Sequence, residues 1–239
     1  MNLVIAHLYY DLLDQYGESG NLKELISVLK SQDINPIVKK LSISDKLNFD
    51  EYDLVIMSAG TENNQKLVSK HLVPYKENIK KAIENNKFFL ITGNSIDFFG
   101  KTIKYLNGQK YKLLGIFNYY VTSSEKRIVG DLLFKDENFV IGFQNRCSII
   151  HNIEFPLFKT VFGYNEEKEG IHYKNFYGTY LLGPLLVRNP HFTQKFVKEL
   201  ILFKDKNYKF KEFDLEFEFN AYNNFLEKHY KDFLENENT

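Results

Sequence analysis

Four short apolar runs recur through the first part of the chain, and segments with helical spacing separate them. The runs are residues 3–8, 37–41, 53–57 and 88–91, and the helical segments are residues 22–31, 67–85 and 96–106. Continuous apolar runs of this length are typical of strands buried on both faces. Strands that alternate with helices in this way predict an α/β fold, with a mostly parallel sheet and flanking helices on both faces.

The carboxyl ends of the strands are where an open α/β sheet holds its functional site. Three loops fall at such ends, after Leu8, Met57 and Ile91. The third loop is the most abrupt, because the strand passes through Thr92-Gly93-Asn94-Ser95 directly into the expected helix. The sequence therefore places the candidate site among these three loops.

Short β-like runs dominate after residue 111 and predict a more antiparallel, hairpin-rich half. They are residues 119–121, 132–134, 139–141 and 148–150. Residues 176–182 have the pattern of a last strand, and residues 193–203 that of a helix. In the tail, Phe219, Tyr222, Asn223 and Leu226 share one helical face. We expect one domain over residues 1–205 and a helical C-terminal extension over residues 206–239.

Charge and cysteine content exclude several classes of protein. The 239 residues include 31 Lys and Arg against 31 Asp and Glu, so the zero net charge argues against binding nucleic acid through its phosphates. No apolar run approaches the roughly 20 residues that span a bilayer. The single cysteine, Cys147, permits neither an intrachain disulfide nor a cysteine-based zinc site. We expect a cytoplasmic protein with no metal and no cofactor.

Four segments carry a resemblance to a known family. They read HLYYDLL with YGESGN (residues 7–13 and 16–21), SAGTENNQ (58–65), GFQN (142–145), and GTYLLGPLL with RNP (178–186 and 188–190). Their order and spacing resemble the cobyric-acid-synthase-type class I glutamine amidotransferases, and most closely the glutaminase-subunit branch of lipid II isoglutaminyl synthase. The resemblance covers roughly residues 1–205, a span typical of one domain. It implies a class I glutamine amidotransferase-like, flavodoxin-like α/β fold.

The resemblance also implies a mechanism. In such domains a cysteine at a strand-to-helix elbow hydrolyses glutamine, and a histidine later in the chain acts as base. The helix N-terminus lowers the pKa of the thiol, and backbone N–H groups hold the oxyanion. The ammonia passes to a synthetase, here a Mur-ligase-like partner that amidates the peptide-stem glutamate of lipid II in peptidoglycan biosynthesis.

This sequence departs from the family pattern at both catalytic positions. The family elbow reads Cys-Gly-Gly-x-Gln-x-x-Gly, and alignment on Gly100 puts Gly93 in the cysteine position. Leu182 replaces the histidine of the Tyr-Leu-His-Gly-Pro stretch, and Ser58 and Ala59 replace the first two glycines of the second loop. Glycine cannot attack a carbonyl and leucine cannot take a proton. The resemblance therefore implies a degenerate catalytic pair, and no catalytic residue is expected.

Other positions near the elbow also depart from the family. Asn94 and Ser95 take its two glycine positions, and Asp97 takes its glutamine position. Arg146 stands where the family usually has histidine after Gly-Phe-Glu-Asn. A carboxylate in place of an amide indicates a pocket that takes a ligand of different charge, although Asp97 in a first helical turn also favours the helix dipole.

Three side chains offer alternative nucleophiles. A one-residue insertion in the helix would put Thr92 in the nucleophile position, and Ser95 carries a hydroxyl in the same turn. Cys147 is the only thiol and, if its segment is a strand, shares a face with His151. We favour structural roles, in which Ser95 or Asn94 caps the helix and Cys147 is an ordinary buried cysteine.

Free backbone N–H groups at the turn can bind an anion or a carbonyl without hydrolysing it. We therefore expect glutamine or another small carboxylate to bind near the elbow. The expected ligand-binding residues are Gly60, Thr92, Gly93, Asn94, Ser95, Asp97, Asn145 and Arg146. In the first segment, His7 and Asp11 are expected to form a structural hydrogen bond rather than a metal or catalytic pair.

The sequence thus predicts a glutamine-amidotransferase-like subunit that positions or regulates a Mur-ligase-like synthetase and has lost glutaminase chemistry of its own. Two alternatives remain. One is a small-molecule sensor that keeps the pocket for glutamine or a related carboxylate. The other is an amidohydrolase that uses Thr92, Ser95 or Cys147.

Overall fold

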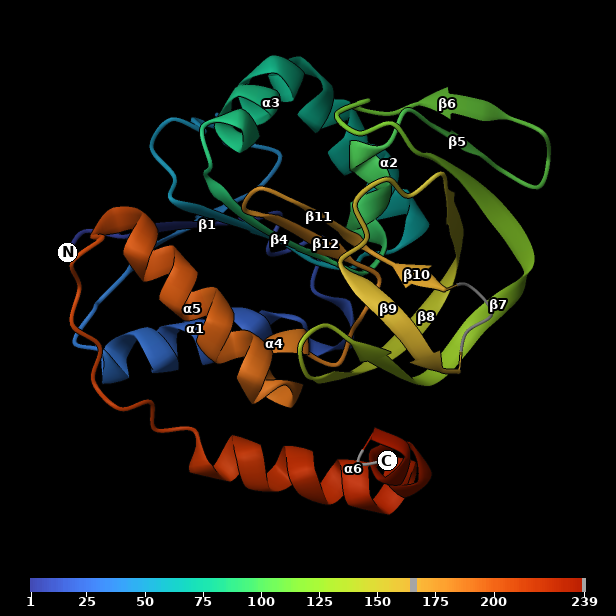
Figure 1. Cartoon of the computed structure of the whole chain (residues 1–239). Coiled ribbons are helices and arrows are strands. Elements are labelled where there is room, and N and C mark those ends of the chain that lie inside the picture. Colours follow the sequence, from blue (N-terminus) through green and yellow to red (C-terminus); the bar gives the residue numbers. More distant parts are fainter. Residues whose placement is uncertain (164–166, 238–239) are drawn as a thin grey trace.

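A parallel sheet forms the centre of the computed structural model, which describes residues 1–163 and 167–237 (Figure 1). Its strands lie in the order β2-β1-β3-β4-β12-β11. They are β1 (Val4–Leu8), β2 (Ile37–Leu41), β3 (Leu54–Met57), β4 (Phe88–Thr92), β11 (Ile171–Tyr173) and β12 (Phe176–Thr179). Neighbouring strands are parallel, except that β11 runs antiparallel to β12. The four strands expected in the first part of the chain are confirmed.

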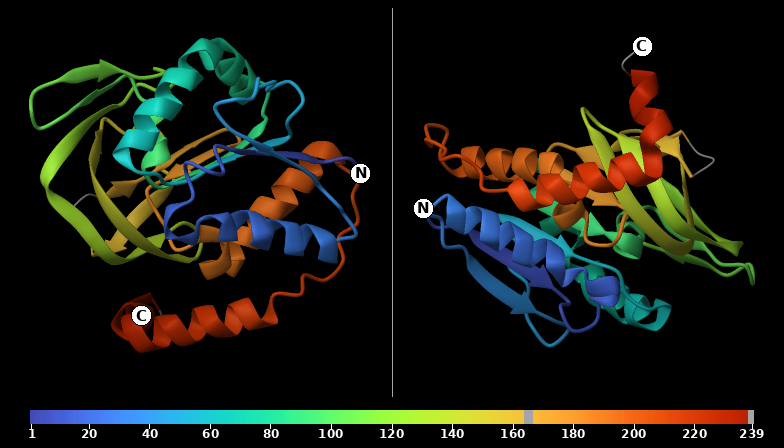
Figure 2. Two further views of the ribbon diagram at one scale, coloured as in Figure 1. Left: turned by 180° about the vertical axis from the view of Figure 1, so that it is seen from behind. Right: turned by 90° about the horizontal axis from the view of Figure 1, so that it is seen from below.

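Helices cover both faces of this sheet, as Figures 1 and 2 show. One face carries α1 (Ser19–Ser31), α4 (Leu185–Arg188) and α5 (Pro190–Lys204), and the other carries α2 (Glu62–Leu72), the 3-10 turn η2 (Val73–Tyr75) and α3 (Lys76–Glu84). Leu22, Leu25 and Leu29, whose spacing predicted the helix α1, are all buried on its inner face. The α/β prediction is confirmed.

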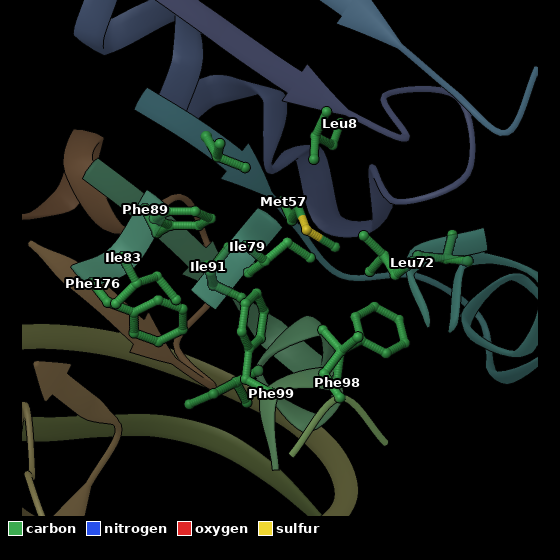
Figure 3. Close-up of a cluster of buried hydrophobic side chains, with 14 of the residues drawn as sticks. Leu8, Met57, Leu72, Ile79, Ile83, Phe89, Ile91, Phe98, Phe99 and Phe176 are labelled. Atoms are coloured by element: carbon green, nitrogen blue, oxygen red, sulfur yellow. The ribbon is translucent and has the colours of Figure 1, made fainter. Parts of the chain in front are cut away.

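Alternate residues of β4 point into two separate cores. Phe89 and Ile91 belong to the core under α2 and α3, which Figure 3 shows together with Phe99. Phe88 and Leu90 belong to the core under α1 and α5. A strand that is buried on both faces has a continuous apolar sequence, and this made residues 88–91 recognisable.

A second, mostly antiparallel sheet flanks the first. It contains the hairpin of β7 (Tyr120–Lys135) and β8 (Phe139–His151), with β5 (Thr102–Lys104), β6 (Lys110–Lys112), β9 (Phe158–Phe162) and β10 (Lys168–Glu169). The hairpin-rich second half is confirmed, but the four short runs are parts of two long strands. The register between these strands shifts between Ser123 and Ile128. Strand β8 packs against the turn that follows β4.

The helix expected over residues 96–106 is wrong. A 3-10 turn, η3 (Gly93–Phe99), ends before Gly100, and β5 follows. Backbone carbonyls that a helix would use have other partners: Tyr119 Oη donates to Ile96 O, and Leu114 N donates to Phe98 O at 2.9 Å. The Tyr119 ring also fills the space in which a side chain at Gly100 would lie. Tertiary contacts therefore override the helical spacing.

The C-terminal helix α6 (Glu216–Glu237) lies against the second sheet (Figure 1). Tyr222, Leu226 and Tyr230 form a small core with Leu133 and Ile141 of the β7–β8 hairpin. The helix expected in the tail is confirmed, whereas a domain boundary at residue 205 stays a prediction. Residues 238–239 of the expected extension lie outside the described part. In the described part, no helix combines the length and apolar character needed to cross a bilayer.

Candidate functional site at the elbow after β4

The elbow that follows β4 is built on one left-handed residue. Gly93 has a φ of 61°, a conformation that a residue with a Cβ rarely adopts. Thr92 ends β4 with an extended backbone, and the chain then turns into η3. A strained strand-to-helix turn is how a nucleophile elbow lifts one side chain out of a sheet. Gly93, and not Thr92, occupies that raised position.

Two side chains fill the space in front of Gly93. A Cβ built on Gly93 would lie 2.6 Å from Ala59 Cβ and 2.8 Å from Leu182 Cδ2. Both separations are well inside the roughly 3.5–4.0 Å at which carbon atoms attract each other. Ala59 comes from the loop after β3, and Leu182 from the segment after β12. Three departures from the family pattern therefore meet at one point.

Strand β8 holds Leu182 in this position. The chain leaves the central sheet after Thr179, so the strand expected over residues 176–182 is shorter than predicted. Leu182 N donates to Phe143 O at 2.8 Å, and Phe143 N donates to Leu182 O at 3.3 Å. The GFQN and GTYLLGP segments are thereby joined, and Leu182 is almost completely buried.

Asn94 ties the elbow to the loop after β3. Its Oδ1 accepts from Gly60 N at 3.0 Å, its Nδ2 donates to Gly60 O at 2.8 Å, and Gln65 Nε2 donates to Asn94 O at 2.8 Å. Ser95 is buried, and its hydroxyl donates to the Ser58 carbonyl. The prediction that Ser95 or Asn94 caps a helix is wrong, because the loop after β3 supplies the hydrogen-bond partners of both side chains.

A buried carboxyl joins the first loop to the elbow and to the segment after β12. Glu18 accepts hydrogen bonds from Thr92 Oγ1 at 2.6 Å, Gly183 N at 2.8 Å and Asn21 Nδ2 at 2.9 Å. Burial raises the pKa of Glu18 to about 7, and the three donors oppose this rise. The Thr92 hydroxyl is therefore committed to Glu18, at the start of α1.

Asp97 is buried in a network that includes Arg146. Tyr180 Oη donates to one Asp97 oxygen at 2.5 Å, and Ser148 Oγ donates to the other at 2.7 Å. The Arg146 guanidinium lies over the Tyr180 ring, 4.0 Å from its centroid, and donates to the Gln144 side chain and the Ser148 carbonyl. Burial raises the pKa of Asp97 to about 6, although both hydrogen bonds and the Arg146 charge lower it. Asp97 and Arg146, which both differ from the family pattern, thus belong to one network.

A cavity of about 390 Å³ opens beside the elbow. Five of the expected ligand-binding residues line it, namely Gly60, Gly93, Asn94, Asn145 and Arg146. The other three, Thr92, Ser95 and Asp97, are buried beside it and make the hydrogen bonds described above. The loops after β3 and β4, which the sequence places at the carboxyl ends of strands, thus meet strand β8 at the cavity.

Sequence reasoning missed Arg127, which lines the same cavity from β7. Its Nη1 donates to Asn145 Oδ1 at 2.6 Å across the hairpin. No sequence signal could have found it, because the register shift near Ile128 decides which β7 residues face β8 at this point. Gln65 was also missed, although it ends the SAGTENNQ segment and lines the cavity.

Cys147 lines the cavity, but the histidine that shares its strand lies far from it. It is half-buried rather than fully buried as expected. His151 is four residues further along β8, and at about 3.3 Å per residue the two are about 13 Å apart. The His151 ring instead bonds to Thr122 Oγ1 at 2.8 Å and stacks on Tyr120. The two residues therefore do not form a thiol–imidazole pair.

The hydrogen bond expected between His7 and Asp11 is wrong. His7 is almost completely buried, and among residues 1–163 and 167–237 neither of its ring nitrogens has a hydrogen-bond partner. Asp11 instead accepts from Ser42 Oγ at 2.6 Å. Burial lowers the pKa of His7, so the neutral ring is favoured. Within the same two ranges, His, Cys, Asp and Glu form no group of three or more that could hold a metal ion.

Comparison with known proteins gives relatives over most of the chain. Residues 4–190 match the model of the CobB/CobQ-like glutamine amidotransferase domain. The GatD subunit of lipid II isoglutaminyl synthase (glutamine-hydrolyzing) from Staphylococcus aureus strain N315 is 32% identical over 225 residues, which cover 92% of this chain and 93% of that protein. The subunit of the same name from Streptococcus pneumoniae strain ATCC BAA-255 / R6 is 30% identical over 205 residues, or 82% of this chain and 79% of that protein.

Solved structures share the fold. A glutamine amidotransferase from Thermotoga maritima has a TM-score of 0.53 at 12% identity, covering 85% of this chain and 86% of that one. Another glutamine amidotransferase has a TM-score of 0.54 at 13% identity, covering 82% of this chain and 98% of that one. The resemblance inferred from the four sequence segments is confirmed. The chain belongs to the CobB/CobQ-like glutamine amidotransferase family.

Proposed function

We propose that the chain is the amidotransferase-like subunit of a complex related to lipid II isoglutaminyl synthase, and that it does not itself hydrolyse glutamine. Two relatives that carry this subunit's name are similar over most of the chain. In this proposal the partner is a Mur-ligase-like synthetase that acts in peptidoglycan biosynthesis, as the sequence resemblance implies. The cytoplasmic location expected from the sequence is part of the same proposal.

The occupied space at Gly93 is the observation that carries the proposal. Hydrolysis of an amide at this elbow requires a nucleophile and, within hydrogen-bond reach of it, a base. Gly93 offers no side chain and Leu182 no proton acceptor. Ala59 and Leu182 also take up the volume that a thiol at residue 93 would need. The lost pair and the packing around it support the same interpretation.

The frame around the elbow supports a continuing role for this face of the molecule. Asn94, Glu18 and the backbone pair of Leu182 with Phe143 hold the surrounding loops in one arrangement. These contacts order a surface without supplying chemistry. An ordered surface at the former catalytic edge suits a subunit that binds, positions or regulates the synthetase.

Ammonia release tests the loss of hydrolysis directly. The purified chain is incubated with glutamine, alone and together with its synthetase, and ammonium is measured over time. We expect no release above background in either mixture, while the synthetase still uses free ammonium. Release that disappears in Cys147→Ala, Thr92→Val or Ser95→Ala would overturn the proposal in favour of an amidohydrolase that uses that side chain.

A second candidate function is the binding of glutamine or a related carboxylate without hydrolysis. The cavity favours it, because Arg127, Arg146 and Asn145 bring guanidinium and amide groups to a volume of about 390 Å³. A cavity of this size suits a small molecule. Calorimetric titration with glutamine should give saturable heat that Arg127→Ala abolishes. The candidate fails if the wild-type chain gives no heat.

A further inference from the structure

A second cavity, of about 400 Å³, lies between α2 and the β5–β6 hairpin. This hairpin projects from the body of the molecule beside α2 in Figure 1. The two cavities are neighbours, since Gln65, Ile103 and Tyr105 line both. The proposed function makes no use of this second cavity.

The inner wall of the cavity is apolar and aromatic. Phe98 and Ile103 are buried there, and Leu113 adds a further apolar side chain. The rings of Tyr105 and Tyr111 pack edge to face, with centroids 5.6 Å apart. Ring pairs of this kind form a preorganised surface for a flat or apolar group.

The rim of the cavity is positively charged. Lys66, Lys70 and Lys112 line it, and within residues 1–163 and 167–237 none of the three has an ion-pair partner. Residues 101–112 of the hairpin include four lysines and no acidic residue, although the whole chain has zero net charge. Lys66 also lies over the Tyr105 ring, 5.8 Å from its centroid. Three ammonium groups gathered in this way raise the potential at the cavity.

Asp97 is the acidic residue among those that line this cavity, and Arg146 of the elbow network balances its charge. Its carboxyl oxygens accept from Tyr180 at 2.5 Å and from Ser148 at 2.7 Å, within the buried network beside the elbow. The positive rim therefore favours the binding of an anionic ligand. Three ammonium groups attract an anion with more than one negative charge most strongly.

We propose that this cavity binds a phosphate group carried on an apolar or aromatic body. Lysine binds phosphate as a point charge from a flexible stem, which suits the rim positions of Lys66, Lys70 and Lys112. The apolar body enters between Tyr105, Tyr111 and Phe98. A soluble phosphate ester and an anionic lipid headgroup share this chemistry.

Titration of the full chain with 1-naphthyl phosphate and with inorganic phosphate tests the site. We expect the ester to bind about tenfold more tightly or better, because its ring buries apolar surface that inorganic phosphate lacks. Co-sedimentation with phosphatidylglycerol vesicles, against phosphatidylcholine vesicles, forms the second arm. Binding to phosphatidylglycerol but not to the soluble ester assigns the phosphate to a lipid headgroup at the same site.

A matched pair of variants separates the site from general charge. Lys66→Glu/Lys70→Glu should weaken binding about tenfold or more, since two attractions become repulsions. The control, Lys23→Glu/Lys30→Glu, makes the same change in net charge on exposed positions of α1, one of them also in the last helical turn. Equal losses in both variants, or no binding of any probe, would overturn the proposal. Ammonia release is not involved, so this failure would leave the proposed function standing.

Discussion

Ala59, Gly93 and Leu182 meet in one small volume, and the residue at each position limits what the other two can be. The missing Cβ of Gly93 is what allows Ala59 and Leu182 to approach. Gly93 also has a φ of 61°, so any side chain there is strained even before it meets a neighbour.

Gly93→Cys alone should therefore destabilise the protein without creating a glutaminase. Overpacking of this kind costs about 1–3 kcal/mol of unfolding free energy, which urea unfolding measures. The triple variant Ala59→Gly/Gly93→Cys/Leu182→His should be more stable than Gly93→Cys and should release ammonia from glutamine. Ala59→Gly/Leu182→His, which lacks the thiol, is the control. Full stability of Gly93→Cys would contradict the packing argument.

Glu169 gives a prediction about pH. It is buried, accepts from Tyr180 N at 2.7 Å and Thr179 Oγ1 at 2.8 Å, and burial raises its pKa from 4.5 to about 7. The folded state therefore holds the proton more tightly than the unfolded state. The resulting stabilisation is complete below pH 4.5 and is lost as the pH rises through about 7.

In Glu169→Gln the fall in unfolding free energy between pH 5 and 8 should be shallower by about 1–2 kcal/mol than in the wild type. Urea unfolding across this range measures it. Glu18 and Asp97 shift in the same direction, so part of the slope should persist in the variant. Identical slopes in the two proteins would show that Glu169 keeps an ordinary pKa.

At the scale of elements, the first four strands of the central sheet and the turn after β4 could be predicted, whereas the short 3-10 form of η3 and the strand β11 could not. Strands buried on both faces carry their own signal, as β4 does. The turn η3 depends instead on Tyr119 and Leu114, which come from outside it and take its carbonyls. Local spacing contains no information about these partners.

Some residues of the candidate site could be predicted from the sequence and others could not. Gly60 and Asn94 lie in loops at the carboxyl ends of strands, so their place at the cavity follows from strand order. Thr92 is still within β4 and, by the alternation of a strand, points to the same side as Leu90 and away from the elbow. The alternation of side chains along β4 could therefore have excluded Thr92 from the cavity lining. To predict that Arg127 lines the cavity, the register of β7 would have been needed.

Tyr119→Phe tests the account of η3. The substitution leaves the buried Ile96 carbonyl without its donor, which should cost about 1–3 kcal/mol of unfolding free energy. Tyr120→Phe is a matched control, because Tyr120 is half exposed and neighbours the same position in the chain. Equal stabilities of the two variants would contradict the role given to the hydroxyl.

At the scale of the whole molecule, the tail is packed against both halves of the fold. Lys211 N donates to Gln32 Oε1 at 2.9 Å beside α1, and α6 covers Leu133 and Ile141 on the second sheet. The segment between α5 and α6 is therefore held against α1 by hydrogen bonds. These contacts bear on whether residues 206–239 are a separable extension.

A chain that ends at residue 205 should expose the apolar surface that α6 covers. We expect a lower melting temperature and binding of a hydrophobic dye, because Leu133, Phe139 and Ile141 lose their cover. In the full chain, Leu226→Ala should cost about 2–4 kcal/mol by leaving a cavity in the same core. A shortened chain that melts at the full-length temperature without binding dye would support an independent domain over residues 1–205.

The contact among Ala59, Gly93 and Leu182 also bears on evolutionary reversibility. A side chain introduced at residue 93 meets two occupied positions, because Ala59 and Leu182 fill the space in front of the glycine. Every single step back thus leads to a protein that is less stable or no more active. In the proposed function, selection therefore has no single substitution to reward, and the packing itself opposes a return to hydrolysis.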